Sequence, residues 1–176
     1  MKNKGFTLIE ILAVIVILGI VMMIAVPRVS ESILKSRRST YITDAKRYIE
    51  SARQAVETGK LKLVSKTTTY YVPGVCLPVD KGQQSPFGDW EVLYVVVTYD
   101  GLKHDYYFMA IDKAGYGIPL TYSEKITENK LGEGLNKNDF KLTTTVGSRT
   151  VIKIIGSDCS LDGATAGTIK KTLAER

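Results

Sequence analysis

The chain has 176 residues, a hydrophobic content of 44% and a net charge of +6, with one histidine and two cysteines. This length suits one ordinary domain, and so mild a positive charge does not indicate a nucleic-acid partner. The single histidine and the two distant cysteines form no paired metal-ligand motif, and no nucleophile motif or phosphate-binding loop is present. The sequence therefore gives an enzyme little support.

A nearly unbroken apolar run occupies residues 6–26 and contains one acid, Glu10. Its length, about 21 residues, is enough to cross a bilayer as a helix. Lys2 and Lys4 precede it, so the positive-inside rule places the N-terminus in the cytoplasm and the rest of the chain outside. A cleaved secretory signal fits less well, because its apolar core is shorter and residues 25–27 make a poor cleavage site.

Beyond the run, apolar residues recur at three- and four-residue steps with charged residues between them and a gap at residues 36–39. The apolar stripe consists of Val29, Ile33, Ile42, Ala45, Ile49, Ala52 and Val56. This period predicts an amphipathic helix, for which Gly59 is the natural stop. We therefore expect one helix from about Phe6 to Thr58, roughly 80 Å long at the usual rise per residue.

Two residues weaken this predicted helix. Pro27 removes a backbone hydrogen bond and usually introduces a kink, and Gly19 lowers helix stability by about 1 kcal/mol relative to alanine. Both residues are also common in membrane helices, where neighbouring groups compensate for them.

The remainder of the chain has strand and turn patterns. Residues 61–89 are mostly connection with one short strand, and residues 90–111 predict a β-hairpin around Asp100-Gly101, a typical type I′ turn pair. A second hairpin is predicted for residues 140–155, and residues 122–131 form a short helix or a loop. The fold class is α+β: a long N-terminal helix, transmembrane in its first half and amphipathic in its second, packs on a C-terminal antiparallel sheet.

The segment "KGFTLIE", followed by the apolar run and Pro27, resembles the class III prepilin signature of type IV pilins and type II secretion pseudopilins. That pattern is a short basic leader ending in glycine, then phenylalanine, threonine, leucine, a hydrophobic residue and glutamate. Every position matches: Gly5, Phe6, Thr7, Leu8, Ile9 and Glu10. The resemblance covers about 30 residues and implies a leader (1–5), an assembly helix (6–27), an amphipathic helix (28–59) and a head domain (60–176).

The resemblance also implies roles for individual residues. A prepilin peptidase is expected to cut between Gly5 and Phe6 on the cytoplasmic side and to methylate the new Phe6 amine. Glu10 is expected to pair with the Phe6 amine of a neighbouring subunit, because an unpaired charge in hydrocarbon costs several kcal/mol. The alternative is that Glu10 lies at the membrane interface without a partner. Residues 19–27 are expected to lose helicity in the filament, or else to form a kinked helix only.

Pilins that resemble this chain often tie down their C-terminal region with a disulfide. A Cys76–Cys159 bond would close a loop of about 80 residues and contribute roughly 4 kcal/mol by the chain-entropy model. The alternative is two buried free thiols, since the sequence does not give their separation. His104 has no metal partner in the sequence and is expected on an exposed strand or turn.

The sequence as a whole predicts a structural subunit of a type IV pilus, anchored in the cytoplasmic membrane before assembly and located on the cell surface afterwards. Its expected partners are further copies in a helical filament, the prepilin peptidase, the assembly machinery and, as a monomer, the membrane. No cofactor or metal is expected, and 22 basic against 18 acidic side chains in the processed chain do not favour nucleic acid. Rivals are a pseudopilin of a secretion or DNA-uptake system, a minor or tip pilin, and a membrane-tethered extracellular enzyme or binding protein.

Overall fold

The computed structural model describes residues 5, 7–61, 63, 68–79, 84–140, 151–155, 159 and 165–166. The chain divides between Arg37 and Arg38 into two compact units. The main elements are α1 (Leu8–Glu57), β1 (Thr68–Pro73), β2 (Gln84–Ser85), β3 (Gly88–Tyr99), β4 (His104–Asp112), β5 (Gly117–Tyr122), β6 (Val151–Ile154) and β7 (Thr165–Ala166). Four short 3₁₀ turns are η1 (Gly74–Cys76), η2 (Ser123–Lys125), η3 (Glu128–Lys130) and η4 (Lys137–Asp139).

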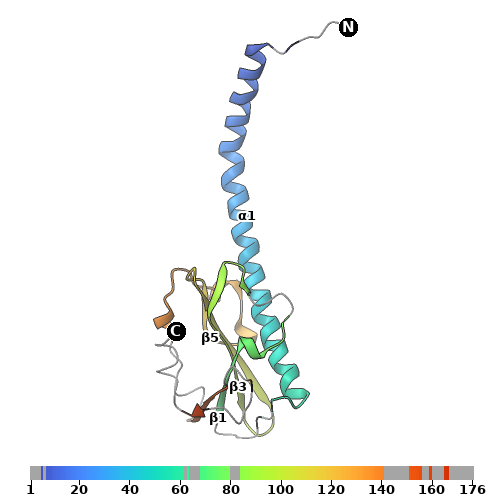
Figure 1. Ribbon diagram of the computed structural model, residues 1–176, viewed down its shortest axis with the longest axis vertical. Coiled ribbons are helices and arrows are strands. Elements are labelled where there is room, and N and C mark those ends of the chain that lie inside the picture. Colours follow the sequence, from blue (N-terminus) through green and yellow to red (C-terminus); the bar gives the residue numbers. More distant parts are fainter. Residues whose placement is uncertain are drawn as a thin grey trace. The chain divides into compact units, whose positions relative to one another are not determined.

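The predicted long helix is confirmed as α1, which has 50 residues and includes Pro27 (Figure 1). At its end the N–H of Thr58 donates to the Gln54 carbonyl, and the N–H of Gly59 donates to the Val56 carbonyl. Gly59 has a φ of 72°, a left-handed conformation that glycine adopts without steric cost. The helix therefore ends where the glycine in the sequence predicts.

The second half of α1 packs on the sheet through the predicted apolar stripe. Ile42, Ala45, Ile49 and Ala52 are all buried. Two tyrosines that the stripe did not include, at positions 41 and 48, are also buried on this face. The Tyr41 hydroxyl lies 3.3 Å from both the Ala110 and the Tyr116 carbonyl oxygens, so it links the helix to β4 and to the turn before β5.

The sheet has the strand order β5-β4-β3-β1-β6-β7, and β2 pairs with β3 (Figure 1). Strands β5, β4, β3 and β1 are antiparallel neighbours, which agrees with the predicted antiparallel sheet, and β6 and β7 also pair in antiparallel. The β1–β6 pair is parallel, with Thr68 opposite Val151 and Tyr71 opposite Ile154. A long helix packed on a mainly antiparallel sheet confirms the α+β fold class.

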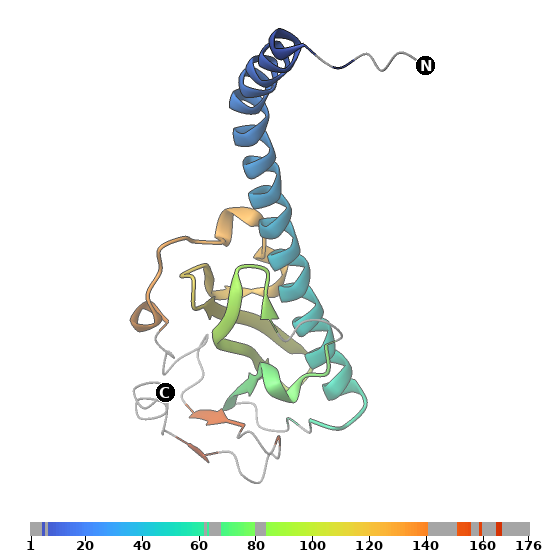
Figure 2. The same cartoon turned by 45° about the horizontal axis from the view of Figure 1, so that its top comes forward.

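The alternation of residues along the strands separates two apolar clusters. Val95 and Val97 of β3 belong to the cluster on the α1 side, and Val96 between them belongs to the cluster on the other side of the sheet. Figure 2 shows the C-terminal part of α1 lying along one face of the sheet. The cluster on the α1 side also contains Phe108, and the opposite cluster contains Met109. Both faces of the central strands are therefore buried.

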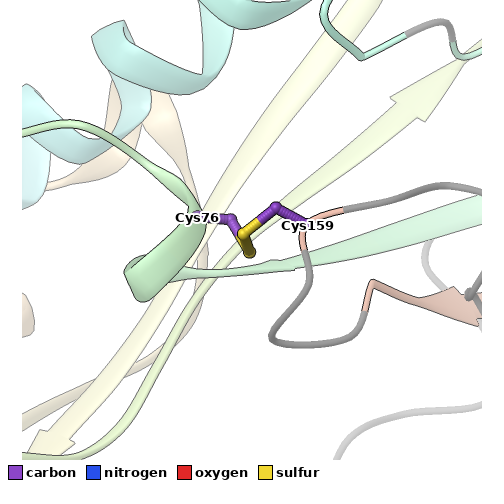
Figure 3. The surroundings of a disulfide bond; sticks show 2 residues. All are labelled: Cys76 and Cys159. Carbon is purple, nitrogen blue, oxygen red and sulfur yellow. A yellow bond between two sulfur atoms is a disulfide. The ribbon is translucent and has the colours of Figure 1, made fainter.

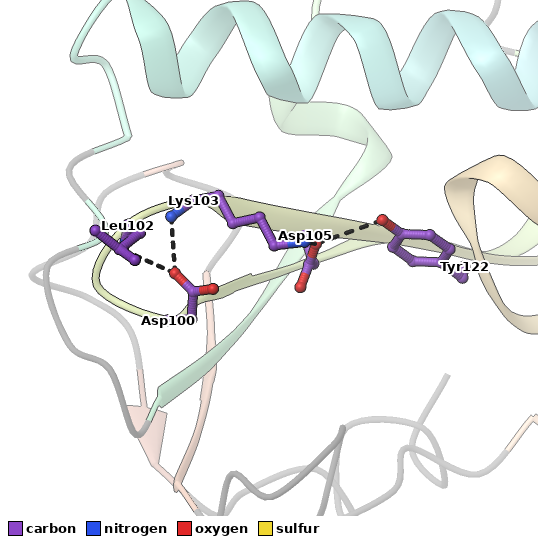
Figure 4. A network of polar contacts seen from close by, with 5 residues as sticks. All are labelled: Asp100, Leu102, Lys103, Asp105 and Tyr122. Carbon is purple, nitrogen blue, oxygen red and sulfur yellow. Dashed lines mark hydrogen bonds and ion pairs between the residues drawn. The ribbon is translucent and has the colours of Figure 1, made fainter.

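The β3–β4 hairpin is confirmed, but the predicted type I′ turn at Asp100-Gly101 is wrong. The last paired residues are Tyr99 and His104, so the loop spans residues 100–103. The Asp100 carboxylate accepts the N–H groups of both Leu102 and Lys103 at 2.7 Å (Figure 4). The Asp100 N–H also donates to the Lys103 carbonyl at 3.2 Å, and these three bonds together stabilise the loop.

Two further sequence predictions concern the region after β5. Residues 122–131, expected to be a short helix or a loop, contain the 3₁₀ turns η2 and η3. Residues 141–150, including the predicted turn at Gly147-Ser148 and the first strand of the second hairpin, lie outside the described residues.

Candidate functional site

The N-terminus of α1 is closed by a reciprocal pair of side chains, Thr7 and Glu10. The backbone N–H of Thr7 donates to Glu10 Oε2 at 2.8 Å, and the Thr7 hydroxyl donates to the same oxygen at 2.7 Å. In return, the Glu10 N–H donates to Thr7 Oγ1 at 3.4 Å. This arrangement is a capping box, which supplies partners for backbone N–H groups that the first helical turn leaves unpaired.

The capping box gives Glu10 a partner within its own chain, which neither interpretation of the sequence included. The sequence does contain the pattern of a capping box, because a threonine stands three residues before a glutamate at the start of an apolar run. All three bonds use Oε2 or the backbone, so Oε1 of Glu10 has no protein partner among the described residues. Glu10 is exposed, and this second oxygen remains open to a donor from outside the chain.

Gly5 and Phe6 form the predicted cleavage site. A Cβ atom built on Gly5 meets no atom within 4 Å, so the fold itself places no restriction on a side chain at this position. Phe6, the predicted site of methylation, lies outside the described residues.

The segment of α1 that follows Glu10 is apolar and exposed. Within the described residues, α1 is one helix long and apolar enough to cross a membrane, and none of its most apolar stretch is buried in the protein. Leu12, Ile17 and Ile24 are 53%, 61% and 63% exposed, so side chains on several sides of the helix lack protein neighbours. A surface of this kind requires lipid or further apolar protein around it.

Gly19 and Pro27, the two predicted weak points, both lie inside continuous helix. A Cβ atom on Gly19 would meet nothing within 4 Å. Pro27 has no N–H, so the Met23 carbonyl lacks its usual helical donor. One turn later the Ser30 hydroxyl donates to the Val26 carbonyl at 3.1 Å, which supplies one extra bond near the proline.

Cys76 and Cys159 are joined by a disulfide, with their Cα atoms 5.3 Å apart (Figure 3). Cys76 ends the 3₁₀ turn η1, directly after β1. Two further contacts connect β1 to the same C-terminal region: the parallel pairing with β6, and the Ile155 N–H, which donates to the Tyr71 carbonyl at 3.0 Å. Ile155 is only 1% exposed, so the bonded segment contributes to the core.

His104 is the first residue of β4 and is partly buried, rather than exposed as expected. Its ring stacks on Tyr99 at 4.6 Å between centroids, which accounts for the lower exposure. A polar hollow of about 360 Å³ lies beside it, and its walls include Arg53, Glu57, Lys103, His104, Asp105, Tyr106, Tyr122 and Glu124.

The polar groups of this hollow mainly contact one another. Lys103 Nζ lies 3.3 Å from the Asp105 carboxylate, which also accepts the Tyr122 hydroxyl at 3.4 Å (Figure 4). The Arg53 guanidinium lies over the Tyr106 ring, 5.4 Å from its centroid. Among the described residues no group of three or more His, Cys, Asp or Glu is placed to hold a metal ion.

The first 26 residues match the family model described as the prokaryotic N-terminal methylation motif. No curated protein and no solved structure matches the chain. The matched segment contains the glycine, the capping box and most of the exposed apolar helix.

Proposed function

Because the chain carries the N-terminal methylation motif that type IV pilins and pseudopilins share, we propose that it is a structural subunit of a type IV pilus. The precursor is cut between Gly5 and Phe6, methylated on Phe6, and polymerised through its apolar helix. The observation that carries this proposal is the location of the motif at the start of a helix whose most apolar stretch is not buried in the protein.

The exposed apolar segment can be buried in two ways, one before assembly and one after it. A single chain can bury this segment only in a bilayer, and the prepilin motif, which is cut on the cytoplasmic side, sets the orientation. Several chains can bury the same segment against one another, so polymerisation replaces lipid contacts by protein contacts. Residues 60–176 then form the outer head of each subunit, and residues 28–59 continue the helix from the apolar segment into that head.

Glu10 supplies the polar contact in this apolar interface. Its Oε2 caps its own helix, and its Oε1 accepts the methylated Phe6 amine of a neighbouring subunit. A carboxylate and an amine within hydrocarbon are each costly alone, so pairing favours the one axial register in which the two groups meet.

A pseudopilus subunit is the second candidate, since the matched motif is common to both kinds of filament. The test is electron microscopy of cells labelled with an antibody against the head domain. Long labelled surface filaments that disappear when the gene is deleted support the pilus. Short filaments formed only at raised expression indicate a pseudopilus, and label confined to the membrane contradicts both candidates.

A further inference from the structure

A cluster of cations follows directly after the apolar segment of α1. Arg28, Lys35, Arg37 and Arg38 lie within eleven residues of one another, together with one acid, Glu31. Arg38 forms an ion pair with Glu133 and donates to the Leu131 carbonyl. The other three cations are exposed and form no ion pair with any residue that the structure describes.

These three residues, Arg28, Lys35 and Arg37, are here called the collar. If the apolar segment spans the bilayer and ends at Val26, their Cα atoms lie roughly 3, 14 and 17 Å beyond that end along the helix axis. Long side chains on a helix lean toward its N-terminus, which for the collar means back toward the membrane. The head-group layer is about 5–8 Å thick on each side of the hydrocarbon, so Arg28 lies within it, and the side chains of Lys35 and Arg37 extend back toward its outer edge.

The collar does not help to orient the chain. Lys2 and Lys4 flank the apolar segment on the cytoplasmic side, whereas the opposite flank carries the collar and Arg38. The positive-inside rule disfavours this excess of cations outside, and removal of residues 1–5 increases the asymmetry. The cations thus lie on the side where they hinder orientation, which points to a different use.

We propose that the collar binds the phosphate groups of anionic lipids on the outer leaflet of the membrane while the subunit awaits assembly. This inference rests on the proposed membrane-anchored stage. A cation near an anionic bilayer surface is stabilised by the surface potential, and the effect adds over neighbouring cations. Arginine forms bidentate contacts with phosphate, and lysine acts as a point charge.

A second copy of the helix is a poorer partner for the collar. The first unit of the chain contains only two acids, Glu10 and Glu31, and Glu10 already caps its own helix. Packing such helices side by side brings more cations than acids together. Anionic lipid provides the missing negative charge. Assembly must then include a step in which the subunit leaves this lipid and enters the filament.

The test uses the full-length chain reconstituted into phosphatidylcholine vesicles that contain a small amount of spin-labelled lipid. The measurement is the fraction of label immobilised by the protein, for phosphatidylglycerol relative to phosphatidylcholine. We expect the native chain to prefer phosphatidylglycerol by about fivefold or more, and high salt to reduce the preference. The variant R28Q/K35Q/R37Q should lose it.

The matched control is K60Q/K125Q/K130Q, which removes the same charge from three exposed lysines of the other unit. It should keep the preference. An equal lipid preference in the collar variant and the control variant overturns the proposal. A collar variant that keeps the lipid preference but forms fewer filaments also overturns it, because the cations then contact another subunit. The assay needs neither cleavage nor filaments, so its failure is distinct from failure of the proposed function.

Discussion

Glu10 has two contacts to make, one within its own chain and one proposed between chains, and substitutions can separate them. Glutamine preserves the capping box but carries no charge, whereas alanine removes both. We expect Glu10→Gln to insert and be processed normally yet to reduce filament yield at least tenfold, because an uncharged amide cannot balance the Phe6 amine. Glu10→Ala should reduce it further.

The measurement is the amount of subunit in sheared filaments relative to the membrane fraction. A normal filament yield for Glu10→Gln would show that Glu10 contributes through the capping box and not through an ion pair between subunits. Thr7→Val serves as the control that removes the cap and leaves the carboxylate.

Asp44 is a buried acid on the face of α1 that packs on the sheet, 4% exposed. Burial raises its pKa, while Arg47, 3.2 Å away, opposes the shift. A raised carboxyl pKa means that the folded state binds more protons than the unfolded state, so this group lowers stability as pH rises through the ordinary carboxyl range. Arg47 is half exposed, so the pair offsets little of the burial cost.

Asp44→Asn should therefore raise the free energy of unfolding at pH 7 by about 1 kcal/mol, a gain that disappears at a pH low enough to protonate the acid. Thermal unfolding of the native and variant chains at both pH values measures the difference. A variant that is less stable than the native chain at pH 7 would mean that the contact with Arg47 outweighs the cost of burial.

At the scale of elements, the stretch of α1 from Gly19 to Pro27 is helical in the single chain, and we propose that it loosens in the filament. Gly19→Ala should stabilise the helix by about 1 kcal/mol, and Pro27→Ala should restore the missing hydrogen bond. Both variants should leave insertion and processing intact and reduce filament yield by about fivefold or more.

The pair of variants distinguishes loosening from close packing. An added methyl group at Gly19 could hinder a neighbour, but Pro27→Ala removes bulk and could not. If Gly19→Ala alone reduces the yield, the glycine serves close approach between helices and the stretch remains helical.

The disulfide and the β1–β6 pairing attach the C-terminal region to the sheet next to Cys76. Replacing both cysteines by serine should lower the free energy of unfolding by about 4 kcal/mol and increase proteolysis after residue 140. Limited proteolysis with mass spectrometry of the fragments measures this. A cleavage pattern unchanged from that of the native chain would mean that strand pairing alone holds the region.

The elements differ in how far the sequence predicts them. The apolar stripe from Ile42 to Ala52 and the glycine after α1 are local signals, and the structure follows them. The loop at Asp100 depends on a side chain capping two N–H groups, which a dipeptide rule does not include. The parallel β1–β6 pair joins residues about 80 positions apart, and no local pattern carries that information.

At the scale of the whole molecule, the proposed processing and assembly site depends on one short segment, the one that matches the N-terminal methylation motif. The glycine, the capping threonine and the glutamate are recognisable from their spacing, and the capping box is a contact that the spacing also specifies. The head domain carries no comparable motif. The role proposed for it, as the outer surface of a filament, therefore rests on the helix to which it is attached.

The central claim is that the chain is cut after Gly5 and assembled, and one measurement tests it most directly. This is the intact mass and N-terminal sequence of the protein sheared from the cell surface, compared with a Gly5→Ala variant. We predict a chain that begins at Phe6, carries one extra methyl group and contains a closed disulfide. The variant should remain uncut in the membrane, although its fold has room for the added methyl group. A native chain that begins at Met1 and occurs only in the membrane fraction would contradict the account.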